Sequence, residues 1–299
     1  MPSPAFVATL VVDPARPTLS DALVARAAQA LPGFVERRWL DPEIAADLFF
    51  DSFDGADARA SLAPLAAEAH YDVIVQPMAT RAKWLLVADM DSTLIGQECI
   101  DELAAAAGFG AHVAGITERA MRGEIPFESA LRERVALLAD LPIAIIDELL
   151  ATRITLNPGA RALVATMRAA GGYAAIVSGG FTPFTGAIAR RLGADEHRAN
   201  RLEIAGDRLT GRVLEPILGA DAKLVALREL TARLGLERWE TMAVGDGAND
   251  LPMLVEAGLG LAYRAKPKVA AAAHARVDHS DLTTLLYAQG IARSEFVEA

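Results

Sequence analysis

The sequence predicts an α/β protein with a doubly wound parallel sheet, a helical cap inserted after the first strand, and a small α+β module in front. Three observations predict this fold. From Lys83 onward, short apolar runs alternate with helical periodicity, as in parallel sheets whose crossovers are helices. The first run is followed by a helical stretch over 97–153, which is too long for one crossover. The N-terminal 80 residues follow a different order of elements.

The N-terminal part is expected to form a ferredoxin-like module over residues 1–80. Its predicted strands and helices alternate in the order βαββαβ, which is typical of that module: 5–12, 19–31, 34–40, 46–50, 56–70 and 72–77. Ser20 is predicted to cap the first helix, and Pro32-Gly33 to end it. This module contains no catalytic constellation.

The second domain is expected over residues 81–299. Its predicted strands are short and apolar: 84–88, 173–177, 241–245, 259–262 and 276–278. The cap is expected over about 97–155, with its helices interrupted at Gly108–Gly110, Gly123–Pro126 and Asp140–Pro142. A cap placed directly after the first strand would cover a site at the end of that strand. Such caps exclude water and select substrate.

Composition limits the classes of function. The chain has 299 residues, 53% of them hydrophobic, which is enough for two domains with sizeable cores. The net charge of −10 argues against a nucleic-acid binder, since no basic stripe can neutralise phosphates. A small anionic substrate needs only a local basic residue. The single cysteine, Cys99, excludes an internal disulfide and fits a reducing compartment.

We find no secretory signal and no membrane span in the sequence. The N-terminus lacks a positive segment followed by a long apolar run, and no apolar stretch reaches the roughly 18 residues that a membrane span needs. We therefore expect a cytoplasmic protein without a membrane partner.

The most informative stretch is LVADMDSTL over 86–94. Its apolar strand runs straight into Asp89 and Asp91, at the carboxyl edge where open α/β sheets bind ligands. Two carboxylates so close repel each other, and a bound cation would offset this while keeping one carboxylate ionised as a nucleophile. The alternative is a helix N-cap or a polar loop, because Asp, Ser and Thr favour both.

Three further elements follow in order. Ser178–Gly180 ends the next strand, where a hydroxyl and close backbone N–H groups can hold a phosphate oxygen. Lys223 begins a helix, where it opposes the helix dipole but suits a nearby phosphate. GDGAND places Asp246, Asn249 and Asp250 on a glycine loop, and such hard oxygen ligands suit Mg²⁺. The alternatives are an ordinary strand-to-helix turn, a solvated helix face and a glycine-rich helix cap.

These four ordered motifs resemble those of the haloacid dehalogenase-like superfamily. Three more stretches are similar to its phosphoserine phosphatase family: IGQECIDELA, ITERAMRGEIPFESALRERVALL and ANRLEIAGDRLTGRV. The resemblance covers about residues 83–285. The N-terminal module resembles, far more weakly, the ACT-like domain fused to some bacterial members.

The resemblance implies roles for the acidic residues. Asp89 would attack phosphorus and become an aspartyl-phosphate. Asp91 would protonate the leaving oxygen and later take a proton from water. Mg²⁺ would be held by the Asp89 carboxylate, the Asp91 backbone carbonyl and Asp246, while Asp250 orients its waters.

The resemblance also implies substrate contacts. Ser178, Gly179 and Lys223 would hold the phosphoryl oxygens, and Asn249 matches a position near the phosphate. In the cap, Glu98, Phe127 and Arg134 match substrate-binding positions, listed here in chain order. The first would face an ammonium group, the second would close the cap, and the third would bind a carboxylate through its bidentate fork. The alternative is that Glu98 and Arg134 are surface charges on cap helices and that Phe127 belongs to the core of the cap.

The resemblance thus implies Mg²⁺-dependent hydrolysis of O-phosphoserine to serine and phosphate, the last step of serine biosynthesis. One alternative is a phosphatase or phosphotransferase for another small phosphomonoester, such as phosphohomoserine. Another is a serine-sensing regulator with an inactive phosphatase body, against which the intact Asp89 and Asp91 pair argues. The expected partner is a small-molecule substrate, and a homodimer is left open.

Overall fold

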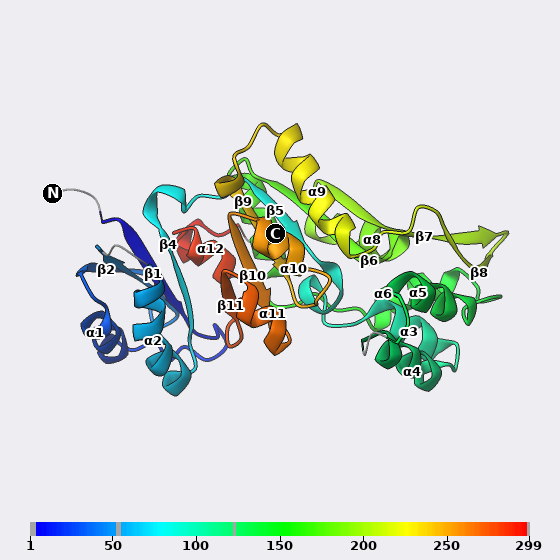
Figure 1. Ribbon diagram of the computed structural model, residues 1–299, viewed down its shortest axis with the longest axis horizontal. Helices are drawn as coiled ribbons and strands as arrows, with labels where there is room; N and C mark the ends of the chain where they lie inside the picture. Colours follow the sequence, from blue (N-terminus) through cyan, green and yellow to red (C-terminus); the bar gives the residue numbers. More distant parts are fainter. Residues whose placement is uncertain (1–3, 52–54, 122–123, 298–299) are drawn as a thin grey trace.

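The computed structural model describes residues 4–51, 55–121 and 124–297. Two sheets organise the chain (Figure 1). The small sheet lies at one end of the molecule, the helical cap lies at the other end, and the large sheet lies between them. Within the described ranges, no helix is both long enough and apolar enough to cross a membrane.

The small sheet has the predicted βαββαβ order. Its four strands are antiparallel in the spatial order β2-β3-β1-β4. The elements are β1 (Phe6–Val11), α1 (Asp21–Ala30), β2 (Phe34–Asp41), β3 (Ala45–Phe50), α2 (Gly55–Ala69) and β4 (Asp72–Pro77). Ser20 caps α1 as predicted, because its hydroxyl accepts a hydrogen bond from the Leu23 N–H at 3.2 Å.

The large sheet has seven strands in the order β11-β10-β9-β5-β6-β7-β8. They are β5 (Leu85–Ala88), β6 (Tyr173–Phe181), β7 (Glu196–Ala205), β8 (Arg208–Leu214), β9 (Thr241–Gly245), β10 (Leu259–Tyr263) and β11 (Ala275–Val277). All neighbours are parallel except β7 and β8. The five predicted strands are confirmed, whereas the β7–β8 hairpin was not predicted.

Helices cover both faces of the large sheet, as a doubly wound sheet requires. One face packs on α9 (Ala220–Arg233), α10 (Leu251–Glu256) and α11 (Pro267–Ala272), and the other on α7 (Ala160–Ala169), α8 (Thr182–Leu192) and α12 (Thr284–Ala288). Along β5 the side chains alternate accordingly: Leu85 and Val87 join the first core, and Leu86 and Ala88 the second. Both faces of β5 are buried, which explains its uninterrupted apolar sequence.

The cap consists of four helices between β5 and β6, as predicted. They are α3 (Cys99–Ala106), α4 (Gly110–Met121), α5 (Phe127–Ala136) and α6 (Ala144–Thr152). The predicted breaks at 108–110 and 140–142 separate helices, and α5 begins directly after Pro126; Gly123, in the remaining predicted break, lies outside the described residues. The two connections to the sheet meet in an isolated antiparallel bridge between Ile95 and Leu156.

The β7–β8 hairpin is attached to the cap. Leu202, Leu209 and Val213 are buried in the same core as cap residues such as Leu131. Backbone hydrogen bonds join the two parts: the Leu209 N–H donates to the Leu141 carbonyl at 2.9 Å, and the Leu209 carbonyl accepts from the Asp140 N–H at 2.9 Å. Figure 1 shows this hairpin reaching past the sheet beside α5.

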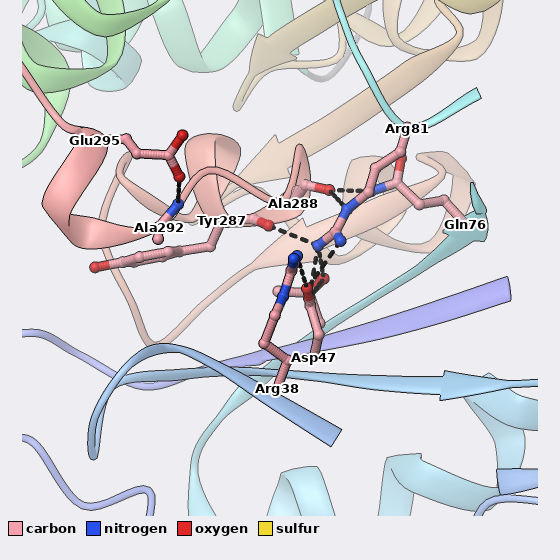
Figure 2. Close-up of polar contacts among 9 residues, drawn as sticks. Arg38, Asp47, Gln76, Arg81, Tyr287, Ala288, Ala292 and Glu295 are labelled. Atoms are coloured by element: carbon pink, nitrogen blue, oxygen red, sulfur yellow. Dashed lines mark hydrogen bonds and ion pairs between the residues drawn. The ribbon is translucent and has the colours of Figure 1, made fainter. Parts of the chain in front are cut away.

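A buried ion pair joins the small sheet to the rest of the chain (Figure 2). Arg81 and Asp47 are 5% and 0% exposed, and their closest nitrogen and oxygen are 2.6 Å apart. The Arg81 guanidinium also donates to the carbonyls of Tyr287 and Ala288, at 3.0 and 2.8 Å. Removing one partner of such a pair leaves a buried charge and typically costs about 3–5 kcal/mol, so this contact fixes how the two parts dock.

Candidate active site

Three neighbouring strands bring the predicted motifs together. Asp89 follows β5, Asp246 follows β9, and Ser178 lies near the end of β6. Ala88 of β5 is in register with Val244 of β9 on one side and Ile176 of β6 on the other. The three motifs therefore meet at the carboxyl edge of the sheet, as predicted from the sequence.

The Asp89 carboxylate is buried and held from two sides. One oxygen accepts a hydrogen bond from the Met90 N–H at 2.7 Å, and the other lies 2.7 Å from the Lys223 ammonium. Burial and the charge of Asp250 raise the pKa of Asp89 well above its usual value, while Lys223 opposes the rise. Lys223 therefore favours the ionised carboxylate that a nucleophile requires.

Lys223 is shared between two carboxylates. Its ammonium also lies 2.5 Å from the second carboxylate, Asp250, and it is itself 2% exposed. Burial alone would lower the pKa of Lys223, but Asp89 and Asp250 raise it above its usual value. This lysine stays charged, so the sequence alternative of a solvated helix face is wrong.

Asp250 organises the loop after β9. Its second oxygen accepts hydrogen bonds from the Asp246 and Gly247 N–H groups, at 3.1 and 2.9 Å. A Cβ atom on Gly245 would lie 2.3 Å from the Asp250 carboxyl carbon, so the strand must end in glycine here. Both Asp250 oxygens thus contact protein donors, and the residue shapes the loop that carries Asp246.

The acidic residues fit a divalent cation. Asp89, Asp246 and Asp250 each offer a carboxylate oxygen, and these oxygens all lie within 4.8 Å of one another. Asp246 accepts a hydrogen bond from the Thr93 hydroxyl at 3.1 Å. Burial, followed by the charge of Asp250, raises the pKa of Asp246 to about 6. One ammonium among three carboxylates leaves excess negative charge, which a hard, oxygen-preferring cation would balance.

Asp91 is held by donors from two parts of the chain. The Ser178 hydroxyl donates to one oxygen at 3.0 Å, and the Cys99 N–H of α3 donates to the other at 2.9 Å. Burial raises the pKa of Asp91, and hydrogen bonds from the Cys99 thiol, the Cys99 N–H and the Ser178 hydroxyl oppose the rise. A Cβ atom on Gly180 would lie 2.7 Å from the Asp91 carboxylate, which explains the second glycine of Ser-Gly-Gly.

Asn200 supports the loop that carries Gly179. This asparagine of β7 is fully buried, donates to the Gly179 carbonyl at 2.8 Å and accepts from the Leu218 N–H at 2.7 Å. Leu218 directly precedes Gly219, the cap residue of α9, which carries Lys223. Sequence reasoning missed this residue, although it lies in the quoted stretch ANRLEIAG.

Glu98 lies at the base of the cap. It accepts a hydrogen bond from the Ser92 hydroxyl at 2.6 Å, and Ser92 adopts a left-handed φ of +55° that is rare outside glycine. The Glu98 side chain remains in contact with solvent, but its carboxyl group is partly dehydrated. That loss of water, followed by the charge of Asp91, raises the pKa of Glu98 to about 7.

Arg134 and Phe127 approach the site from α5. The Arg134 guanidinium donates to the Ala130 carbonyl at 3.2 Å and to the Thr117 hydroxyl at 3.4 Å. Partial burial lowers the pKa of Arg134, while the charges of Asp101 and Glu98 oppose this, so the three charges share one region of the cap. The Phe127 ring lies over the Ser-Gly-Gly loop, where a Cβ atom on Gly179 would be 3.6 Å from its edge.

Asn249 folds back over its own loop. Its side-chain oxygen lies where a Cβ atom on Gly247 would come within 2.2 Å. Asn249 is half-buried, next to Asp250. All the predicted site residues are thus gathered at the sheet edge or on the adjoining cap.

Comparison with known proteins decides the family. A family model described as haloacid dehalogenase-like hydrolase matches residues 86–255, more than half of the chain. The chain belongs to the haloacid dehalogenase-like hydrolase family. A phosphoserine phosphatase of Mycobacterium tuberculosis is 45% identical to this hydrolase over 241 residues, which form 80% of the hydrolase and 59% of that relative. The hydrolase therefore spans less than two thirds of that relative's length.

Solved structures resemble the hydrolase in whole and in part. A probable phosphoserine phosphatase from Vibrio cholerae, in its unliganded form, has 34% identity and a TM-score of 0.76, covering 97% of this chain and 88% of its own. A phosphoserine phosphatase solved as an analogue of its phospho-aspartyl intermediate has 40% identity and a TM-score of 0.64. That match covers 69% of this chain and 98% of its own.

Proposed function

We propose that this hydrolase converts O-phosphoserine to serine and inorganic phosphate through an aspartyl-phosphate at Asp89. One observation carries the proposal: a buried carboxylate paired with Lys223 stands beside a second carboxylate, Asp91, that faces a cap bearing both Glu98 and Arg134. The names of the relatives support phosphoserine as the substrate. As the last step of serine biosynthesis, this reaction fits the cytoplasmic location expected from the sequence.

In the first step, an Asp89 oxygen attacks phosphorus and the bond to the seryl oxygen breaks. Asp91, in its acid form, gives its proton to that oxygen, because serine is a poor leaving group. The Lys223 ammonium and the Gly179 N–H offset the charge on the phosphoryl oxygens, and the Ser178 hydroxyl joins them by turning its proton from Asp91 to the phosphoryl group, since Asp91 in its acid form is neutral. Free serine leaves, and Asp89 carries the phosphoryl group.

In the second step, water attacks the aspartyl-phosphate. Asp91, now ionised, takes a proton from that water, and the Asp89 carboxylate is released together with phosphate. The same carboxylic acid thus serves in both directions, and the enzyme returns to its starting state. Closure of Phe127 over Gly179 excludes other water from the site.

The Asp89 and Asp246 carboxylates, with the Asp91 backbone carbonyl, would hold Mg²⁺. When bound, the ion neutralises charge between these carboxylates and the incoming phosphoryl group. Asp250 would orient the surrounding waters while it holds Lys223 and the loop. Asn249 lies on the same loop and would approach the phosphate.

Asp246→Asn is expected to raise the Mg²⁺ concentration for half-maximal rate by about tenfold to a hundredfold, because the loop then offers a neutral oxygen in place of a charged one. The measurement is phosphate release titrated with Mg²⁺. Asp207→Asn, at the exposed tip of the β7–β8 hairpin, is the control and should leave the titration unchanged. An unchanged titration for Asp246→Asn would place the cation elsewhere.

Arg134 and Glu98 would read the two ends of the amino acid. The guanidinium binds the substrate carboxylate, and the Glu98 carboxylate binds the ammonium group. Both contacts bind the substrate in its ground state as strongly as in the transition state, so they lower KM more than they raise kcat.

Arg134→Ala is therefore expected to weaken phosphoserine hydrolysis while sparing phosphoethanolamine, which has no carboxylate. A truncated charge contact costs about 2–5 kcal/mol, so the ratio of the two kcat/KM values should fall at least tenfold and up to a thousandfold or more. Arg132→Ala, on the same helix and exposed, is the matched control. A constant ratio would make Arg134 a surface residue of the cap and remove the main physical support for phosphoserine.

A panel of phosphomonoesters, assayed for phosphate release with and without a chelator, tests the proposed function. We expect phosphoserine to be the preferred substrate and the chelator to stop its hydrolysis. Preference for another phosphoester would favour the related phosphatase or phosphotransferase, and no release at all would favour a regulator with an inactive body. A homodimer, left open by the sequence, is a separate proposal that light scattering tests.

A further inference from the structure

The backbone N–H of Cys99 occupies an unusual place. Cys99 is the first residue of α3, and the first N–H groups of a helix have no partner within the helix. The preceding Glu98 supplies no side-chain cap, because its carboxylate accepts from Ser92 instead. The Cys99 N–H donates to the Asp91 carboxylate at 2.9 Å. The N-terminus of α3 is therefore capped by a side chain that lies outside the cap domain.

This contact leaves the Asp91 carboxylate fixed in rotation. Its first oxygen is held by Cys99, and its second oxygen faces Ser178 on the phosphate-binding loop. Gly180 lies against that second oxygen, so little room is left for the carboxylate to turn. The Cys99 N–H, by holding the first oxygen of Asp91, therefore fixes the orientation of the second oxygen, which must reach the leaving group.

We propose that the Cys99 N–H is a positioning group for the general acid Asp91, and that it makes proton transfer to the leaving group depend on the placement of the cap. The inference rests on the proposed function, which supplies the leaving group. It assigns α3 a task besides substrate recognition. The Asp91 carboxyl group has the correct orientation only while the N-terminus of α3 lies next to it.

Cys99→Pro removes the N–H at a helix position where proline is well tolerated. The extended backbone of Glu98, with φ −96° and ψ 111°, suits a residue before proline. The Cys99 thiol also contacts Asp91, so the matched control is Cys99→Ala, which removes the thiol and keeps the N–H. We expect Cys99→Pro to slow serine release in the first turnover about tenfold to a hundredfold, and p-nitrophenol release from its phosphate ester less than threefold, because an aryl group needs little acid help. Cys99→Ala should stay near wild type for both.

Combination with Asp91→Asn separates positioning from a general structural effect. If Cys99 acts through Asp91, the double variant should lose no more activity than Asp91→Asn alone. Equal losses on both substrates, or losses that multiply in the double variant, would overturn the proposal. If wild type does not hydrolyse phosphoserine, the proposed function fails first, and this is seen before any variant is compared.

A spectroscopic test remains valid should the proline variant not fold. Cys99 is the only cysteine of the chain, so ¹⁵N-cysteine labelling gives a single amide signal. A hydrogen bond to a carboxylate shifts that proton downfield, and Asp91→Ala should move it upfield. A signal that ignores Asp91→Ala would show that the contact does not form in solution and would overturn the proposal.

Discussion

Asp89→Asn is expected to abolish turnover, with kcat/KM falling on the order of 10⁴-fold or more. The amide keeps the shape of the side chain but cannot attack phosphorus. The fold should be retained, because Lys223 keeps its ion pair with Asp250 and the Met90 N–H keeps an oxygen acceptor. The substitution also removes one of the buried negative charges, and with it the repulsion between Asp89 and the carboxylates of Asp250 and Asp91.

The measurement combines phosphate release with thermal unfolding followed by circular dichroism. Rapid acid quenching and mass spectrometry should find a phosphorylated peptide containing Asp89 in wild type and none in the variant. Asp147→Asn, on the exposed face of α6, is the control for loss of a carboxylate. Turnover like that of wild type in Asp89→Asn would end the aspartyl-phosphate mechanism.

Asp91→Asn is expected to have the second largest effect, and this effect should depend on the leaving group. Serine leaves as a basic alkoxide unless it is protonated, so its release in the first turnover should slow about 10²–10⁴-fold. Release of p-nitrophenol should slow far less. The second step uses Asp91 as a base for either substrate, so steady-state turnover of the aryl ester should slow after an initial burst.

Stopped-flow detection of p-nitrophenol and quenched-flow detection of serine measure the two first turnovers. The asparagine oxygen can still accept from the Cys99 N–H, so the variant should keep its local structure. Loss of equal size on both leaving groups would exclude Asp91 as the general acid. A burst with the aryl ester but none with phosphoserine would support it.

The part of the site that could be predicted lies directly at strand ends. Asp89, Ser178 and Asp246 each follow a buried apolar run, and parallel strands place such ends at one edge. The apolar runs are long enough to locate the strands, and the glycines after them mark close approaches that the structure confirms at Gly180 and Gly245. The local sequence was therefore enough to predict where these residues lie and what chemistry they can perform.

The β7–β8 hairpin could not be placed by the same reasoning. Its strands continue past the last pairing with β6, at Asn200, and bury only some of their side chains against the cap, so they lack the apolar run that marks β5 or β9. The alternation in ANRLEIAGDRLTGRV, with Gly206 at a positive φ in the turn, is the signal that indicates a hairpin.

Two supporting contacts could not be predicted from the sequence. The Cys99 N–H meets Asp91, eight residues earlier, only because the chain between them turns back, and Asn200 meets Gly179 only because β7 lies beside β6. Neither residue carries a charge or belongs to one of the four motifs. A backbone N–H donor in particular cannot be recognised from the sequence, because nearly every residue type has one.

The attachment of the hairpin to the cap has a consequence for engineering this enzyme. The chain crosses between sheet and cap four times, twice around 97–155 and twice around 201–214, so the cap is assembled from two separate stretches of sequence. Deleting or exchanging 97–155 alone would strip the cover from Leu209 and Val213 and expose an unpaired strand edge. A chimaera meant to acquire another member's substrate choice should therefore exchange both stretches together.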